Sequence, residues 1–125
     1  MKNLIIDAAN EKIFFSIISK KQSYTTTHIN SRENFDKFMS LLMSFMKKNK
    51  INFDDIKRIF VNQGPGKFSS IRISISIAKA ICLSKNITLI GFSSEILKKG
   101  NYNILLELDK KNLLIKDLIK PLYSS

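Results

Sequence analysis

The 125-residue chain has few of the residues from which cross-linked and catalytic sites are usually built. It has one cysteine, Cys82, so an internal disulfide is excluded, which fits a reducing cytosol. Its one histidine, His28, cannot form a zinc site with that cysteine unless several carboxylates join them. No apolar run approaches the roughly 20 residues of a membrane span, and the N-terminal apolar core is too short for a signal peptide. We therefore expect one cytoplasmic domain without a membrane partner, folded around an ordinary apolar core.

The net charge of +11 is high for this length. It is compatible with a polyanionic partner such as RNA, so a basic nucleic-acid-binding module is one alternative function. However, the lysines are spread along the whole chain, which favours a generally solvated lysine surface over a specific basic patch. We expect RNA binding by the chain alone to be weak and mainly electrostatic.

The first part of the chain predicts three strands and a helix. Three short segments, separated by tight turns and rich in apolar or β-branched residues, predict antiparallel strands at 2–9, 12–20 and 24–29. Asn30, followed by Glu33 three residues later, forms a capping-box pattern and predicts a helix over 31–48. Apolar residues fill an arc of roughly 200° of this helix, about twice what one sheet covers. The excess favours burial on two sides, and extra exposed apolar residues are the alternative.

The second part of the chain alternates between further strands and helices. Residues 57–62 and 87–92 are short and apolar and predict two strands. The segment 68–84 alternates like a strand, but it is long and ends in helix-favouring residues. A strand is expected at 103–108, and a strand or short helix at 113–119.

A Gly64-Pro65-Gly66 turn follows the strand at 57–62. It is not a phosphate-binding P-loop, because that motif needs glycine in place of Val61 and Ser or Thr in place of Phe68. We expect the glycines to supply backbone angles that other residues resist, with Pro65 stiffening the turn. An anion held at the N-terminus of the next helix is the alternative.

Residues 61–80, VNQGPGKFSSIRISISIAKA, resemble the "GPG-(S)F-(T/S)(G/S)-(L/I)R-(I/V)" signature of the TsaB (YeaZ) family. The resemblance covers roughly residues 1–97 and favours a helix over 68–84. It implies an α/β fold, the ribonuclease-H-like subdomain of the actin-like ATPases, in which a mixed sheet with three antiparallel N-terminal strands carries packed helices. We expect this subdomain at 1–100 and a short remnant of the second, largely missing subdomain at 101–125.

The resemblance also implies a function. Family members are non-catalytic subunits that bind the TsaD catalytic protein during formation of threonylcarbamoyladenosine in tRNA, and tRNA is reached through that complex. A TsaE-like ATPase is an allowed further partner, and self-association is allowed when the chain is alone. The family interface is made by the first two helices, here 31–48 and 68–84. The partner-binding residues expected on them are Phe35, Phe38, Met39, Leu42, Met46, Ile71, Arg72, Ile75 and Lys79.

Asp7 stands where nucleotide-using actin-like proteins hold a metal ion. Those proteins follow it with a glycine-rich hairpin, whereas this chain continues as Ala8-Ala9-Asn10. We therefore expect no metal, no cofactor and no autonomous ATP hydrolysis, with a degenerate actin-like ATPase as the rival. Ser70 replaces the glycine that the family usually has before its arginine, and we expect it to limit close helix contact.

Overall fold

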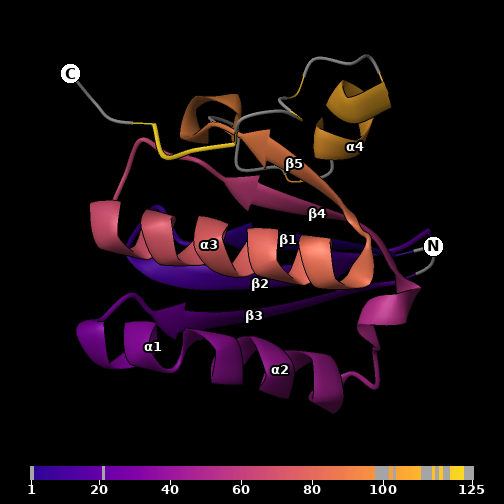
Figure 1. Ribbon diagram of the computed structural model, residues 1–125, viewed down its shortest axis with the longest axis horizontal. Helices are drawn as coiled ribbons and strands as arrows, with labels where there is room; N and C mark the ends of the chain where they lie inside the picture. Colours follow the sequence, from indigo (N-terminus) through magenta and orange to yellow (C-terminus); the bar gives the residue numbers. More distant parts are fainter. Residues whose placement is uncertain are drawn as a thin grey trace.

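The computed structural model describes residues 2–20, 22–97, 102, 104–110, 114, 116 and 119–122. Its centre is a five-stranded sheet in the order β3-β2-β1-β4-β5 (Figure 1). The strands are β1 (Lys2–Asp7), β2 (Lys12–Ile18), β3 (Ser23–Ile29), β4 (Ile56–Asn62) and β5 (Thr88–Phe92). β1, β2 and β3 pair antiparallel, while β4 pairs parallel to β1 and β5 parallel to β4. This mixed sheet with three antiparallel N-terminal strands confirms the predicted architecture.

The burial of each strand follows its place in the sheet. β1 lies in the middle, and Leu4, Ile5 and Ile6 are all buried because both faces of the sheet are covered there. β3 lies at the edge, and its residues alternate between exposed and half-buried. This explains why β1 reads as a continuous apolar run and β3 as an alternating, threonine-rich one.

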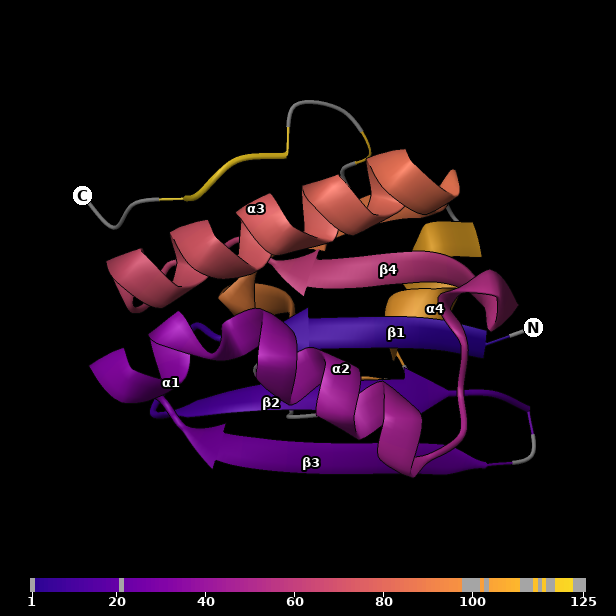
Figure 2. The same ribbon diagram turned by 60° about the horizontal axis from the view of Figure 1, so that its bottom comes forward.

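Three helices cover one face of the sheet, and they are α1 (Arg32–Asp36), α2 (Phe38–Lys48) and α3 (Phe68–Lys85) (Figure 2). The single helix predicted over 31–48 is wrong in one respect. The backbone leaves the helical region at Lys37, with φ −105° and ψ 11°, so α1 and α2 are separate. Even α3, with 18 residues, is not apolar enough for a membrane span, and none of the described helices is both long and apolar enough to be one.

The predicted capping box at Asn30 is also wrong. Ser31 is the N-cap of α1, and its hydroxyl accepts a hydrogen bond from the Asn34 amide at 3.3 Å. Asn30 is buried instead, and its Nδ2 donates to Asn10 O at 2.7 Å and lies 3.0 Å from Ser70 Oγ. Both residues are good cap formers, and buried tertiary hydrogen bonds decide which of them begins the helix.

Ser70 joins α3 to the loop after β1. It is fully buried, and its hydroxyl donates to Ala8 O at 2.7 Å. The side chain therefore faces the sheet and not a neighbouring helix, so the expected limit on helix contact does not arise from it. The hydrogen bond satisfies a hydroxyl that would be costly to bury unpaired.

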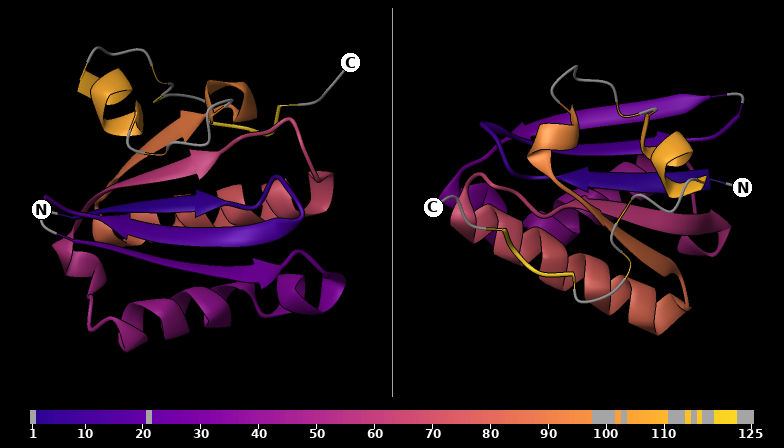
Figure 3. Two further views of the ribbon diagram at one scale, coloured as in Figure 1. Left: turned by 180° about the vertical axis from the view of Figure 1, so that it is seen from behind. Right: turned by 90° about the horizontal axis from the view of Figure 1, so that it is seen from above.

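The described C-terminal residues cover the second face of the sheet (Figure 3). The predicted strand at 103–108 is wrong, because α4 (Ile104–Lys110) is a helix. Leu105 and Asp109, four residues apart, are both buried, which is helical spacing. Asp109 accepts from Arg58 at 2.9 Å and pairs with Lys116 at 3.3 Å, and these contacts hold α4 on the sheet. The element predicted at 113–119 lies largely outside the described residues.

We expect the Cys82 thiol to be unreactive in the folded chain. It is buried on α3, and burial raises its pKa to about 12. At pH 8 the thiolate is then roughly a thousandfold scarcer than for an ordinary cysteine. Iodoacetamide labelling followed by mass spectrometry should be slow in buffer and fast in guanidinium chloride. Equal rates in the two conditions would show that the thiol is accessible.

Candidate interface on the helical face

Apolar side chains remain at the surface where α2 and α3 lie side by side over the sheet (Figure 2). On α2, Met39 is 41% and Met43 48% exposed. On α3, Phe68 is 48% exposed, while Ile73 and Ile77 are half-buried. We call these residues, together with Arg72, the helical face; it consists of Met39, Met43, Phe68, Arg72, Ile73 and Ile77.

The helical repeat of α2 decides which side chains reach this surface. One side of the helix, which includes Phe38, Leu42 and Phe45, is buried against the sheet. Leu41 lies beside β3, where it lines a shallow hollow with strand residues. At 100° per residue, the exposed methionines at positions 39 and 43 lie on the opposite flank, toward α3.

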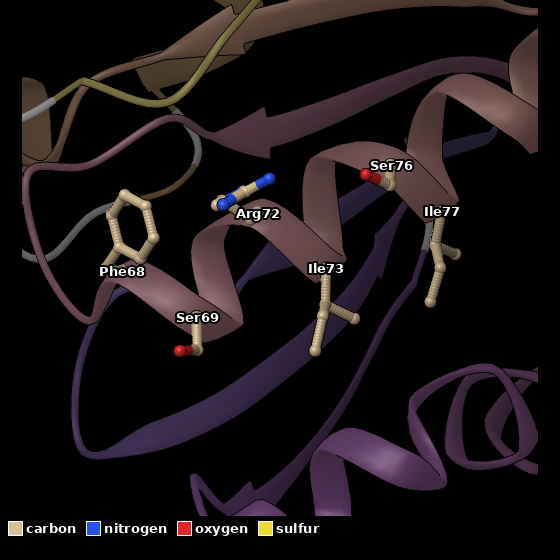
Figure 4. A pocket seen from close by; sticks show the side chains of 6 residues that line it. All are labelled: Phe68, Ser69, Arg72, Ile73, Ser76 and Ile77. Atoms are coloured by element: carbon tan, nitrogen blue, oxygen red, sulfur yellow. The ribbon is translucent and has the colours of Figure 1, made fainter.

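Two sets of side chains leave α3 on its outer side (Figure 4). Ser69, Ile73 and Ile77 point toward α2, whereas Arg72 lies on the other side of the helix, near Phe68. These side chains line an open hollow of about 430 Å³. The Arg72 guanidinium carbon lies 5.2 Å from the centre of the Phe68 ring, a cation–π distance. Within the described part of the chain, Arg72 has no ion pair with a carboxylate.

The structure divides the predicted partner-binding residues into two groups. The first group reaches the surface: Met39, Arg72 and Lys79 are exposed, and Phe35 is half-buried. The prediction is corrected for the other five, which are no more than 3% exposed and pack in the chain's own core; they are Phe38, Leu42, Met46, Ile71 and Ile75. Each of the five lies on the side of its helix that faces the sheet.

Four surface residues were missed by sequence reasoning, and they are Met43, Phe68, Ile73 and Ile77. Four of the five isoleucines of α3 form two pairs, 71 with 75 and 73 with 77, on different sides of the helix. The small residues Ser70, Ser74 and Ala78 are buried on the same side as the first pair. This run of small residues was the available signal for the side that packs closely on the sheet.

The Gly64-Pro65-Gly66 turn positions the start of α3. Gly64 has φ +100°, which favours glycine. Gly66 is required for a different reason, since a Cβ there would lie 2.2 Å from Ala9 O. The adjacent Lys67 amide donates to the same carbonyl at 2.9 Å. The turn therefore packs directly on the loop after β1, and this contact sets where α3 begins.

Asp7 is an internal link at the end of β1. Its Oδ1 accepts from the Ala9 amide at 3.2 Å and from Asn62 Nδ2 at 3.0 Å, and its Oδ2 accepts from the Tyr102 hydroxyl at 2.6 Å. Burial, followed by the charge of Asp7 and the hydrogen bond to it, raises the pKa of Tyr102 well above its usual range. Asn62 Oδ1 accepts from the Gly64 amide at 2.8 Å, which connects Asp7 to the turn.

These contacts do not fit a metal ion at Asp7. Both carboxylate oxygens are occupied by donors from the chain itself, and the residue is only 3% exposed. Across the described ranges, no three His, Cys, Asp or Glu side chains are placed to share a metal ion. The Asp7 carboxylate serves here to fix the backbone at the end of β1.

Comparisons with known proteins agree on one family. A family model described as "TsaD: tRNA N6-adenosine threonylcarbamoyltransferase" matches residues 16–97. The tRNA threonylcarbamoyladenosine biosynthesis protein TsaB of Buchnera aphidicola subsp. Schizaphis graminum is 31% identical over 91 residues, which are 73% of this chain and 43% of that protein. A tRNA N6-adenosine threonylcarbamoyltransferase of Bacillus thuringiensis strain Al Hakam is 35% identical over 63 residues, 50% of this chain and 18% of that one.

A solved structure shows the same fold. YeaZ from Pseudomonas aeruginosa superposes with a TM-score of 0.68 at 14% identity, over 74% of this chain and 43% of that chain. The chain thus spans less than half the length of the TsaB and YeaZ proteins that it matches.

Proposed function

Because the chain belongs to the TsaB (YeaZ) family of tRNA threonylcarbamoyladenosine biosynthesis proteins, we propose that it is a non-catalytic subunit that binds the TsaD catalytic protein. The observation that carries this proposal is the helical face. Its exposed apolar side chains lie on the two elements that form the family interface. In the proposed complex, tRNA and a TsaE-like ATPase join through TsaD.

The chemistry of the helical face suits a protein partner. Methionine, aromatic and arginine side chains are enriched in protein interfaces, and the helical face includes the exposed Met39 on α2 and Phe68 and Arg72 on α3. The partner should bring apolar side chains to the methionines and a carboxylate to Arg72, whose charge is exposed. When the partner is absent, the same surface is the one on which two copies of the chain would associate.

Direct binding tests this function. The purified chain should form a stable complex with a TsaD-like protein from the same source, with a dissociation constant of about 1 μM or tighter, as for an interface of standard size. Calorimetry and size-exclusion chromatography would measure it. If the two proteins elute separately at concentrations of tens of micromolar, on the order of ten times that constant, the proposed function is wrong.

We expect no ATP hydrolysis by the isolated chain. Asp7 is occupied by internal hydrogen bonds, and residues 7–10 contain no glycine to let a backbone approach phosphates. Phosphate release in the presence of Mg²⁺ should stay at the level of a protein-free blank, and a fluorescent ATP analogue should not bind. Turnover that Asp7→Ala abolishes in a still-folded chain would favour the rival, a degenerate ATPase.

A further inference from the structure

The fold brings together lysines that are far apart in the sequence. β1, β4 and β5 run parallel, so all three begin at the same end of the sheet. α2 and α3 both finish at that end, each leading into one of these strands (Figures 1 and 2). We call this region the strand-start end.

Seven lysines lie at the strand-start end. Lys2 and Lys57 are in the first two residues of β1 and β4, and Lys85 is the last residue of α3. Lys20 follows β2, whose Ile18 pairs with Asn3 at the beginning of β1. The complete set is Lys2, Lys20, Lys47, Lys48, Lys50, Lys57 and Lys85. All except the half-buried Lys2 are exposed.

Little negative charge offsets these lysines. The exposed acidic residues placed among them are Asp54 and Asp55, in the short 3₁₀ helix η1 (Phe53–Asp55) that precedes β4. The buried Asp109, near the start of β4, is paired with Arg58 and Lys116. Among the described residues, none of the seven lysines forms an ion pair. The positive charge at this end is therefore concentrated and unneutralised.

Positive charge at the opposite end of the molecule is largely offset by acidic residues. Lys37 pairs with Glu33 at 3.0 Å, and Lys67 pairs with Glu11 at 3.6 Å. The remaining exposed charges there are of both signs, and they are Lys12, Arg32, Asp36, Arg72, Glu95 and Lys120, which lies beside Gln63 after β4. A lysine-rich composition alone would place similar positive charge at both ends of the molecule. The unequal distribution of charge therefore needs another explanation.

We propose that the strand-start end contacts the phosphate backbone of RNA. Lysine ammonium groups act as point charges toward phosphates, and they carry no base readout. The contact would be electrostatic and independent of RNA sequence. This inference rests on the proposed function, because the proposed complex is what brings tRNA to the chain.

The position of the strand-start end suits this role. Lys47 follows Met43 by one helical turn of α2, so the lysines adjoin the helical face without being part of it. An RNA held by a protein bound to the helical face would extend onto the lysines. An anionic membrane would attract the same charge. Among the described residues, however, Leu83 is the one large, highly exposed apolar side chain near the C-terminal end of α3. A single exposed leucine is too little for insertion.

Two matched triple variants test the proposal. One carries Lys48→Gln, Lys57→Gln and Lys85→Gln, at the strand-start end. The control carries Lys12→Gln, Lys37→Gln and Lys67→Gln, at the opposite end. Both lose the same charge from the same +11 chain. The ion pairs broken in the control are exposed and contribute little to stability.

The measurement is fluorescence anisotropy with labelled tRNA at several salt concentrations, for the chain alone and with the TsaD-like protein. The strand-start variant should bind roughly tenfold more weakly, and its slope of log K against log salt should be smaller by about 2 to 3. The control should stay within about twofold of the wild type. Equal losses in both variants would mean that the charge acts diffusely and would overturn the proposal, as would no loss in either.

Two further arms separate the alternatives. If the strand-start variant loses binding to phosphatidylserine vesicles but keeps tRNA binding, the surface is a membrane site and the proposal is wrong. Binding to the TsaD-like protein is measured separately and should be unchanged in both variants. If the wild-type chain does not bind the TsaD-like protein but binds tRNA through these lysines, the proposed function is wrong and the proposed RNA contact is still supported.

Discussion

A Met39→Asp variant is expected to bind the TsaD-like partner at least about a hundredfold more weakly than the wild-type chain, while the fold is kept. Met39 is 41% exposed, so the aspartate is solvated in the free chain. In the complex, the charge would be buried without a counter-ion among apolar side chains, which costs several kcal/mol. A hundredfold loss corresponds to about 2.7 kcal/mol. Titration calorimetry measures the affinity, and circular dichroism checks the fold.

Ile29→Asp is the matched control for this experiment. Ile29 is also an exposed apolar residue, at 72%, but it lies on the edge strand β3 and not on the helical face. Its affinity should remain within about threefold of the wild type, since rim and distant positions contribute little. If both aspartates weaken binding equally, or if Met39→Asp binds normally, the helical face is not the interface.

The second large effect is expected from Gly66→Ala, which should destabilise the chain by roughly 3 kcal/mol or more. The new Cβ would lie 2.2 Å from Ala9 O and 2.8 Å from Ala9 Cβ, so the backbone itself must move. That movement would break the hydrogen bond from the Lys67 amide to Ala9 O and shift the start of α3. The melting temperature should fall by about 10 °C or more, as measured by circular dichroism.

Lys67→Ala provides the comparison for Gly66→Ala. It changes the neighbouring residue but keeps the backbone amide that donates to Ala9 O. It also removes an exposed ion pair with Glu11, which is worth less than about 1 kcal/mol. A melting temperature for Gly66→Ala as high as that of Lys67→Ala would mean that the close approach at position 66 is not a packing requirement.

The sheet could be predicted from the sequence, because local signals agreed with one another. Short apolar or alternating segments and tight turns correctly located all five strands. α4 was missed because 103–108 carries apolar residues in a pattern that suits either a strand or a helix. Only the packing of Leu105 and Asp109 on one side distinguishes the two structures. The N-cap was misassigned because the hydrogen bonds of Asn30 are made with residues distant in the sequence.

The partner-binding residues expected on α3 included Ile71 and Ile75, which are buried, and did not include Ile73 and Ile77. A prediction from sequence places polar residues at the surface and apolar residues in the core, and several residues of α3 do the opposite. Ser70 and Ser74 are buried because their hydroxyls donate to the carbonyls of Ala8 and Ile71. Ile73 and Ile77 reach the surface instead. A hydroxyl that is satisfied by backbone can lie inside at little cost, so polarity alone does not identify the buried side.

The strand-start end could not be predicted either, for a topological reason. Its lysines are spread over the chain from position 2 to position 85. They meet because parallel strands begin at one end of the sheet, and each crossover helix must return to that end. A linear sequence shows only even spacing, whereas the connections between strands determine which charges become neighbours.

The covering of the second face of the sheet has a consequence for how the chain is made. The hydrogen bond between Asp7 and Tyr102 joins residues 95 positions apart, and Ile5, Phe60 and Phe92 are covered by the late Leu105. As the ribosome synthesises the chain, all five strands have been made before that covering segment emerges. The nascent sheet therefore presents an apolar face until the segment that contains Leu105 has left the ribosome. Chaperones and neighbouring nascent chains can bind this face during that interval, until the covering segment folds onto it.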